Sequence, residues 1–456
     1  MPYTPHKAYV VGVGLTKFDK PRGERDYPEL GLEATVKALI DAGITYDDVE
    51  TAAVGYCYGD STCGQRALYQ LGMTGIPIVN VNNNCSTGSS AFVLAANSIM
   101  AGQADCALAL GFEKMAPGSL GSAWNDRAPP MEGTMSQVFE IEAEKEYKTD
   151  DFGPFAARIF GAAGQEYVEK YGATWDHIAA IAAKNHKHSV KNPYAQFRVS
   201  PSPQEVAKAR KITREVTLPM CSPTSDGGAA AIVVSEDFIK KHNLQDRAIE
   251  IAGLGVSTDS PRLYEDRSRI ELAGADMSRR AATIAYKQAG LTAKDIQVLE
   301  LHDCFAPNEL VTYPALGLCA ENEAHKIVEA GDNTFGGKWV VNPSGGLESK
   351  GHPLGATGLG MVAYMALQLR GEAGALQVEN VKAALTHNIG LGGSCVVSIL
   401  KKASFYKDGA HNKDRFGYDF ANECRRMTEE ELEKVKSKHF SDYLPASIPE
   451  PQTSKL

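Results

Sequence analysis

Cys85 is the residue of this chain best placed to act as a nucleophile. It follows an apolar stretch, residues 76–81, and stands directly before a run of small and apolar residues, 86–100, that predicts a buried helix. The N-terminus of a helix carries a partial positive charge and free N–H groups. We expect these to lower the pKa of the Cys85 thiol and to favour the reactive thiolate. A buried, unreactive cysteine is the other interpretation, because most free cysteines are of that kind.

His352 could serve as the base for such a thiol. It stands in a polar, glycine-rich segment, residues 349–358, ahead of a second expected helix. An imidazole can take a proton from a thiol at neutral pH. A loop histidine that bonds a backbone carbonyl would explain the same pattern.

A third polar group, His302-Asp303-Cys304, follows directly on an expected strand at 298–301. Open α/β sheets keep their sites at the carboxyl ends of strands. Cys304 could transfer protons there, and His302 could donate a hydrogen bond to an oxyanion. A buried, purely structural hydrogen-bonded cluster is the alternative.

A fourth segment, His387-Asn388-Ile389-Gly390-Leu391-Gly392-Gly393, follows an expected strand at 383–386. We predict a turn here whose glycines let backbone N–H groups face a ligand. A plain glycine turn without a ligand would look the same.

The chain repeats itself at an offset of 247 residues, since residues 41–49 resemble residues 288–296 and Cys57 pairs with Cys304. In the same way, Cys85-Ser86-Thr87-Gly88 of the first copy corresponds to His352-Pro353-Leu354-Gly355 of the second. A duplicated fold places equivalent positions near a pseudo-twofold axis. We therefore expect Cys85 of one half to face His352 of the other. Cys304 has ionisable neighbours and is the catalytic candidate of its pair, whereas Cys57 is expected to be a packing residue.

The elements that must position these side chains alternate between strands and helices, which predicts a layered α/β fold. In the first copy we expect strands at 8–14, 49–58, 76–81, 104–111 and 226–234, with helices at 30–42 and 86–100. In the second copy we expect strands at 249–255, 298–301, 340–342, 383–386 and 395–400, with helices at 277–289 and after residue 352.

The predicted domains follow from this rhythm. The first half comprises residues 1–115 and 221–246, an inserted loop domain spans 116–220, the second half spans 247–402, and a tail spans 403–456. In the insertion, Lys184, His186, Lys187, His188 and Lys191 could meet phosphates, but a solvated helix face is the favoured interpretation. The tail predicts one helix, 428–438, with a capping box, and otherwise a flexible appendage.

Bulk properties exclude several classes of function. A net charge of −9 and a pI of about 5.7 argue against a nucleic-acid binder. No apolar run approaches the roughly 20 residues that span a bilayer. The nine cysteines are scattered without a Cys-x-x-Cys pair, so we expect neither a disulfide framework nor a metal site. Ser454-Lys455-Leu456 matches a peroxisomal address, which predicts binding to the peroxisomal import receptor and a peroxisomal location.

The four segments, taken in order, resemble the thiolase family, in particular its sterol carrier protein x type. Gly111-Phe112-Glu113-Lys114-Met115 and Gly331-Asp332-Asn333-Thr334 strengthen the resemblance, which covers residues 6 to about 402. It implies two duplicated βαβαβαββ halves that form a five-layered αβαβα core with an inserted loop domain. It also implies a homodimer.

The resemblance implies roles for four residues. Cys85 would be the nucleophile that takes an acyl group as a thioester, His352 its base, and His302 an oxyanion donor. Most thiolases carry a Cys-x-Gly motif where this chain has Asn388-Ile389-Gly390, so Cys304 would replace that cysteine in proton transfer. Cys395 is expected to lie in the core.

The implied activity is that of a peroxisomal 3-oxoacyl-CoA thiolase of fatty acid β-oxidation. It would use CoA to release acyl-CoA and acetyl-CoA or propionyl-CoA by a ping-pong mechanism, with CoA as substrate and no metal or redox cofactor. The sequence leaves open whether 2-methyl-branched or sterol side-chain substrates are accepted. The missing Cys-x-Gly cysteine motivates the alternative, a non-catalytic acyl-CoA- or lipid-binding scaffold of the same fold.

Overall fold

The computed structural model describes residues 6–21, 23–116, 126–128 and 153–440. Its first five strands form one half of a sheet, in the order β3-β2-β4-β5-β1. They are β1 (Tyr9–Leu15), β2 (Thr51–Gly55), β3 (Ile78–Val81), β4 (Cys106–Glu113) and β5 (Gly227–Val234). Every residue of β4 and β5 is buried, because both faces of this half are covered by helices.

The second five strands repeat this arrangement, in the order β6-β10-β9-β7-β8. They are β6 (Ile249–Ser257), β7 (Val298–Glu300), β8 (Val340–Val341), β9 (Ala383–Gly390) and β10 (Ser394–Lys402). The two halves join where β1 pairs with β6 through Tyr9–Glu250 and Val10–Ile249, which gives a ten-stranded sheet. The predicted duplication is confirmed, with the pseudo-twofold axis between β1 and β6.

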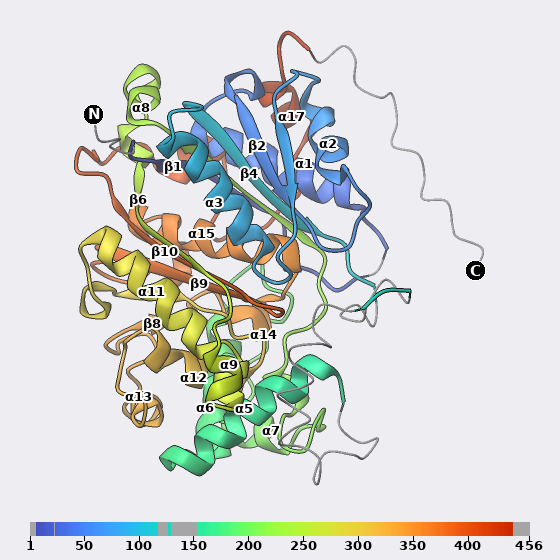
Figure 1. Cartoon of the computed structure of the whole chain (residues 1–456). Helices are drawn as coiled ribbons and strands as arrows, with labels where there is room; N and C mark the ends of the chain where they lie inside the picture. Colours follow the sequence, from blue (N-terminus) through green and yellow to red (C-terminus); the bar gives the residue numbers. More distant parts are fainter. Residues whose placement is uncertain (1–5, 22, 117–125, 129–152, 441–456) are drawn as a thin grey trace.

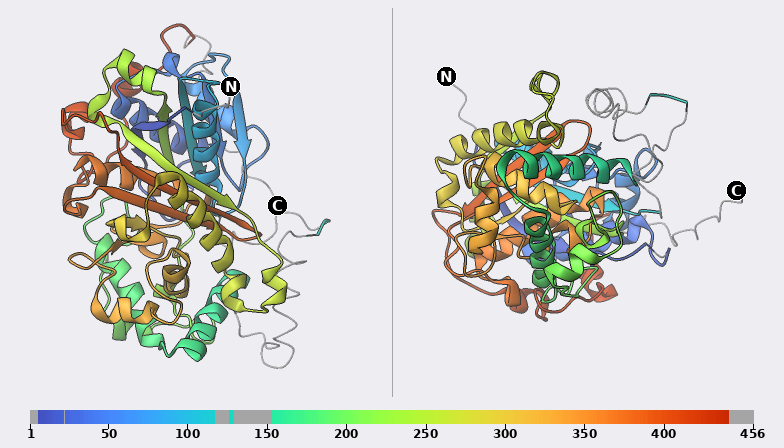
Figure 2. Two further views of the ribbon diagram at one scale, coloured as in Figure 1. Left: turned by 60° about the vertical axis from the view of Figure 1, so that its left-hand side comes forward. Right: turned by 90° about the horizontal axis from the view of Figure 1, so that it is seen from below.

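Helices on either side of the two half-sheets produce the layers (Figures 1 and 2). The helix α1 (Tyr27–Ala42) packs on β1 and β5, and α11 (Ala275–Ala289) packs on β6 and β10. Between the halves lie α3 (Thr87–Met100) and α15 (Leu354–Arg370). All residues of α15 are buried because it contacts β4 and β5 on one side and β9 on the other. Shorter helices are α2 (Cys63–Leu68), α8 (Glu236–His242), α9 (Arg262–Glu265) and α10 (Arg269–Leu272).

The two central helices approach each other through glycines at their first turns. A Cβ atom on Gly88 would lie 2.6 Å from the carbonyl oxygen of Gly355. A Cβ atom on Gly355 would lie 2.3 Å from the carbonyl oxygen of Phe112. Only glycine fits at such distances. Gly88 and Gly355 each lie three residues after a predicted catalytic residue, so this contact sets how closely those residues can meet.

The helices that follow β4 in the sequence pack against helices of the second half, at the bottom of Figure 1. They are α5 (Phe155–Tyr171), α6 (Trp175–Ser189) and α7 (Pro203–Lys208). They share a hydrophobic core with α12 (Ala306–Ala315) and α13 (Ala324–Ala330), and α6 also contacts α14 (Gly346–Lys350). Residues 117–125 and 129–152 of the predicted insertion lie outside the described residues.

The prediction of a solvated helix face for the five basic residues of 184–191 is wrong for three of them. His186 and His188 are buried, and their rings bond the carbonyl oxygens of Pro219 and Asn342 at 3.0 and 2.9 Å. Lys184 forms a buried ion pair with a glutamate of α12. These side chains hold α6 to α12 and to the segments that contain Pro219 and Asn342.

The prediction of a turn over residues 387–393 is also wrong in its first part. The strand β9 continues to Gly390, which pairs with Ser394 of β10, so only Leu391, Gly392 and Gly393 make the turn. Buried backbone groups must find hydrogen-bond partners, and β10 supplies them here. His387 and Asn388 are therefore rigidly held strand residues.

The tail is an integral part of the fold over residues 403–440. It contains α16 (Asn412–Phe416) and α17 (Glu429–Val435). Thr428 caps α17 with the predicted box, although the helix ends three residues before Lys438. Arg415 bonds the buried carboxylates of Asp41 and Glu372 at 2.8 and 2.7 Å. The expected flexible appendage is thus wrong for this segment. Its remainder, residues 441–456, lies outside the described residues.

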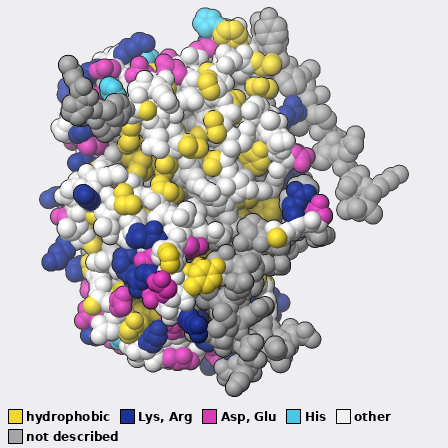
Figure 3. Space-filling model, viewed as in Figure 1, with side chains coloured by type: hydrophobic (Ala, Val, Ile, Leu, Met, Phe, Trp, Pro, Cys, Tyr) yellow, Lys and Arg dark blue, Asp and Glu magenta, His cyan; other side chains and the backbone are white. Residues whose placement is uncertain are grey.

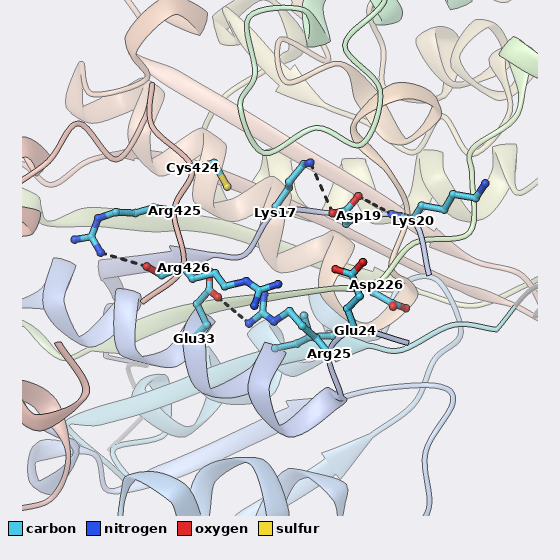
Figure 4. Close-up of a pocket in the computed structure, with 11 residues that line it drawn as sticks. Lys17, Asp19, Lys20, Glu24, Arg25, Glu33, Asp226, Cys424, Arg425 and Arg426 are labelled. Atoms are coloured by element: carbon cyan, nitrogen blue, oxygen red, sulfur yellow. Dashed lines mark hydrogen bonds and ion pairs between the residues drawn. The ribbon is translucent and has the colours of Figure 1, made fainter. Parts of the chain in front are cut away.

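A cavity of about 230 Å³ lies between the tail and the loop that follows β1 (Figure 4). Its lining contains residues of both charges, and several of these are paired, as in Lys17–Asp19 and Arg25–Glu33.

Among the described residues, no helix is both long and apolar enough to cross a membrane.

Candidate active site

Cys85 lies at the junction of the two halves, two residues before α3. The preceding Asn84 has a left-handed backbone with φ of 51°, which asparagine tolerates better than most residues. The Cys85 thiol donates to Asn84 Oδ1 at 3.6 Å, and Asn84 Nδ2 donates to the carbonyl oxygen of Leu391 at 3.0 Å. The turn between β9 and β10 is thereby tied to the loop that carries the candidate nucleophile.

Three of the predicted site residues meet in one buried place. The sulfur of Cys85, one ring nitrogen of His302 and one of His352 all lie within 4.8 Å of one another. Cys85 and His352 each stand two residues before one of the central helices, so the close packing of α3 and α15 brings them together. His302 enters from the end of β7. The rings of His302 and His352 meet edge to face, with centroids 5.3 Å apart.

Hydrogen bonding fixes the proton on the His352 ring. Thr357 Oγ1 donates to the carbonyl oxygen of Pro353 at 3.0 Å and lies 2.7 Å from His352 Nδ1. Because the hydroxyl proton is already used, Nδ1 must be the donor in the second bond. His352 Nε2 is then bare, and it has no hydrogen-bond partner among the described residues. Burial, together with the charge of Lys350, lowers the pKa of His352 to about 3, so the ring is a neutral base at pH 7.

The His302 ring has the opposite tautomer to the His352 ring. Ser89 Oγ donates to Asn388 Oδ1 at 3.0 Å, so Asn388 Nδ2 faces His302 Nδ1, also at 3.0 Å. Since Nδ1 accepts, the proton of the neutral ring is on Nε2. Burial and then the neighbouring His352 and His387 hold the pKa of His302 well below its usual range. His302 is therefore a neutral hydrogen-bond donor. A histidine that binds a metal through one ring nitrogen commonly donates a hydrogen bond from the other. His302 Nδ1 instead accepts a hydrogen bond from Asn388 Nδ2.

The pKa of Cys85 departs from the sequence prediction. Burial and the charge of Glu113 raise the pKa of the thiol to about 12, although the N–H groups of Cys85 and Leu391 oppose the shift. The expected lowering by the helix N-terminus is wrong because desolvation of the sulfur outweighs it. Cys85 thus rests as a thiol and requires a base at the moment of attack.

Glu113, at the end of β4, supports the site from behind. Its carboxylate accepts hydrogen bonds from the backbone N–H groups of Cys57, Tyr58 and Gly355 at 3.0, 2.8 and 2.9 Å. Burial raises the pKa of Glu113 to about 7 in spite of these bonds. The carboxylate joins the end of β2 to the start of α15. Sequence analysis assigned no role to Glu113, since a lone acid in an apolar strand carries no distinguishing signal.

The other cysteines differ in their surroundings. Cys304 is buried, and burial together with the nearby Cys85 and Asp303 raises its pKa, so it rests as a protonated thiol. Cys57 is half-buried beside the cluster that contains Cys85, and its thiol donates to the carbonyl oxygen of Asn84 at 3.2 Å. Cys395 is fully buried in β10, in the core.

Thr357 and Asn388 bond the two candidate histidines, and sequence reasoning did not single them out. Both stood inside the quoted motifs, but their role depends on which ring nitrogen they meet. Spacing cannot show this, because Asn388 and His302 come from different strands.

We predict that Thr357→Val slows alkylation of Cys85 by iodoacetamide at pH 7.5 by about tenfold or more, because His352 loses the partner that fixes its tautomer. Peptide-resolved mass spectrometry over time would give the rate. Thr357→Ser keeps the oxygen and serves as the matched control, with a rate near that of the unchanged chain. A Thr357→Val protein that is alkylated as fast as Thr357→Ser would contradict the assignment of His352 as base.

Comparison with known proteins agrees with this geometry. The family model of the thiolase N-terminal domain matches residues 8–215, and that of the thiolase C-terminal domain matches residues 263–402. Sterol carrier protein 2 of Rattus norvegicus is 54% identical over 398 residues, which cover 87% of this chain and 72% of that protein. Benzoylsuccinyl-CoA thiolase subunit BbsB of Thauera aromatica is 36% identical, with coverage of 85% and 95%.

A crystal structure of human mitochondrial 3-ketoacyl-CoA thiolase superposes with a TM-score of 0.64 at 19% identity, covering 88% of this chain and 100% of that one. This likeness shows that the fold is the same. Together with the sequence relatives, it establishes that the chain belongs to the thiolase family and is similar throughout its core to the thiolase-containing sterol carrier protein 2.

Proposed function

We propose that this chain is a 3-oxoacyl-CoA thiolase that cleaves its substrate through a thioester on Cys85. The observation that carries the proposal is the pair of ring nitrogens beside the sulfur: a bare Nε2 on His352 and a protonated Nε2 on His302. A base and a neutral donor next to one thiol suit nucleophilic attack on a carbonyl. A crystal structure of the human mitochondrial enzyme is in complex with CoA, which supports CoA thioesters as substrates.

In the first half-reaction His352 Nε2 takes the proton of Cys85 and the sulfur attacks the keto carbon, C3. The N–H groups of Cys85 and Leu391 face the sulfur and would bind the oxyanion that forms there. The bond between C2 and C3 then breaks, which leaves the acyl group on Cys85 and an enolate on the departing CoA thioester. His302 Nε2–H would bind the enolate oxygen, and Cys304 would protonate C2.

In the second half-reaction the Cys304 thiolate takes the proton of an incoming CoA thiol. The CoA sulfur attacks the thioester carbon, and the same two N–H groups bind the new oxyanion. Collapse releases acyl-CoA, and the leaving Cys85 sulfur recovers its proton from His352. Both cysteines regain their protons at the end of the cycle. Because the first product leaves before CoA attacks the acyl-enzyme, the kinetics are of the ping-pong type.

The second candidate is a non-catalytic acyl-CoA- or lipid-binding scaffold. It is favoured by Asn388 standing where most thiolases carry the Cys-x-Gly cysteine. The geometry gives Asn388 a task in the site, however, since its amide orients His302. This weighs toward an enzyme in which proton transfer falls to Cys304.

We predict that incubation with a 3-oxoacyl-CoA adds one acyl group to Cys85, seen by intact-mass and peptide mass spectrometry. Thiolysis with CoA should follow at a measurable rate, and Cys85→Ala should lower that rate by at least about 10³-fold. Cys319→Ala, which removes a half-buried thiol just after the end of α12, is the control. Straight and 2-methyl-branched substrates of several lengths would define the acyl specificity. Absence of an adduct with every substrate would favour the scaffold.

We further propose that the protein works in peroxisomes, in fatty acid β-oxidation, through recognition of Ser454-Lys455-Leu456 by the import receptor. The tripeptide lies outside the described residues. The chain carrying an N-terminal fluorescent protein should accumulate in peroxisomes, and removal of the three residues should leave it in the cytosol. Peroxisomal fluorescence that persists without the tripeptide would refute this address.

We also propose a homodimer formed along the edge strand β3. That strand is one of the two edge strands of the sheet, and Val79 on it is 53% exposed. Leu94 of α3 is 39% exposed, and Figure 3 shows apolar side chains over the upper half of the molecule, with charged side chains at its upper edge and at the lower left. Sedimentation equilibrium should give twice the chain mass of 49.0 kDa, and Val79→Lys should shift it toward the monomer. A monomer at micromolar concentration would exclude this assembly.

A further inference from the structure

Cys85, His302 and His352 form a group with the geometry of metal ligands. The sulfur and one nitrogen of each ring all lie within 4.8 Å of one another, and all three residues are buried. A thiolate and two imidazoles are ligand types that zinc prefers. Around a tetrahedral zinc ion, with bonds of about 2.1–2.3 Å, such atoms stand about 3.5 Å apart, so the three side chains would have to close in by about 1 Å. The cysteine spacing could not predict this group, since its members lie far apart in the sequence.

His352 already has the form that a zinc ligand needs. A histidine that binds a metal through one nitrogen is usually held by a hydrogen bond that its other nitrogen donates. His352 Nδ1 donates to Thr357 Oγ1 at 2.7 Å. His352 Nε2 is buried and has no hydrogen-bond partner among the described residues. A buried polar atom without a partner calls for an explanation, and a cation bound beside the Cys85 sulfur would supply one.

His302 has the other tautomer, and a single amide decides this. Asn388 donates from Nδ2 to His302 Nδ1 at 3.0 Å, because Asn388 Oδ1 accepts from Ser89 Oγ. The proton of the His302 ring is therefore on Nε2, which cannot bind a metal in that form. If the Asn388 amide turned over, Oδ1 would accept from His302 Nδ1–H, and Ser89 Oγ would accept from Nδ2, since a hydroxyl can both donate and accept. His302 Nε2 would then be a free ligand.

We propose that this group of one cysteine and two histidines binds Zn²⁺ as a reversible inhibitor, and that the Asn388 amide limits the affinity. On binding, the Cys85 S–H bond breaks, a sulfur–zinc bond forms and the proton passes to solvent. The His302 ring loses the proton of Nε2 and gains one on Nδ1, so one proton is released for each ion bound. Water takes the fourth position. The inhibitor blocks the Cys85 sulfur, but its binding does not depend on the proposed function, because it requires no substrate.

Co²⁺ and Zn²⁺ are the probes. We expect one ion to bind per chain at micromolar free metal. The ultraviolet charge-transfer absorption of a Co²⁺–thiolate bond detects Co²⁺, and competition with a chromophoric chelator measures Zn²⁺. Bound Zn²⁺ should slow the alkylation of Cys85 by iodoacetamide by about tenfold or more, because the metal engages the sulfur that must attack. Zn²⁺ should also inhibit thiolysis, and a chelator should restore it.

Asn388→Asp is the most informative variant. One carboxylate oxygen still accepts from Ser89 Oγ, and the other accepts from His302 Nδ1–H. We therefore expect the Zn²⁺ affinity to rise by about 10- to 100-fold, the usual effect of a partner that orients a metal-binding histidine. His302→Asn removes a ligand and should weaken binding. Cys57→Ala is the matched control with unchanged affinity, since it removes a neighbouring thiol outside the ligand group. Thermal unfolding without metal checks that the variants are folded.

Three results would overturn the proposal. The first is absence of the Co²⁺–thiolate absorption from the unchanged chain at millimolar Co²⁺. The second is bound Zn²⁺ that leaves the alkylation of Cys85 unchanged, which would place the ion elsewhere. The third is equal affinity of Asn388→Asp and the unchanged chain, which would refute the role of the amide. A chain that binds Zn²⁺ as expected but cleaves no 3-oxoacyl-CoA would refute the proposed function and leave the zinc site standing.

Discussion

The contact between the first turns of α3 and α15 is the constraint on which the site depends. Each helix starts at the middle of the molecule, and the backbone of one rests on the backbone of the other through Gly88 and Gly355. Cys85 and His352 precede these glycines by three residues, so the separation of the helices sets the separation of thiol and imidazole. The Glu113 carboxylate accepts the N–H of Gly355 and fixes α15 against the end of β2. A side chain at either glycine would separate the two halves.

Burial then decides the resting charges of the site. It raises the pKa of Cys85 and lowers the pKa of His352 and of His302, so that all three are neutral at pH 7. Charge would appear only when a substrate carbonyl is attacked. The donors for that charge are already in place, because Asn388 orients His302 and the β9–β10 turn positions the Leu391 N–H. Prearranged donors in a dry site stabilise developing charge more than mobile water does.

The sequence predicted what repeats and missed what depends on burial. The offset of 247 residues paired the strands, and matched helix starts brought Cys85 to His352, because duplication fixes topology. The pKa of Cys85 is raised instead of lowered, because the direction of the shift depends on how completely the sulfur is desolvated. The tail and the charged residues of α6 were misjudged for a related reason: charged residues predict solvent exposure, but Arg415 of the tail and Lys184 of α6 form buried ion pairs. Such pairing involves residues far apart in sequence and leaves no local pattern.

The departure of this chain from the common thiolase motif is best understood as two linked changes. A histidine at position 302 needs a partner that leaves its proton on Nε2, and the Asn388 amide is that partner. A cysteine at 388 would offer Nδ1 only a weak S–H donor. It would also leave the Ser89 hydroxyl without its present acceptor. With Asn388 orienting His302, the proposed proton-transfer thiol is Cys304, which follows β7 and stands two residues after His302. The missing cysteine therefore argues for a rearranged acid–base pair rather than for a lost activity.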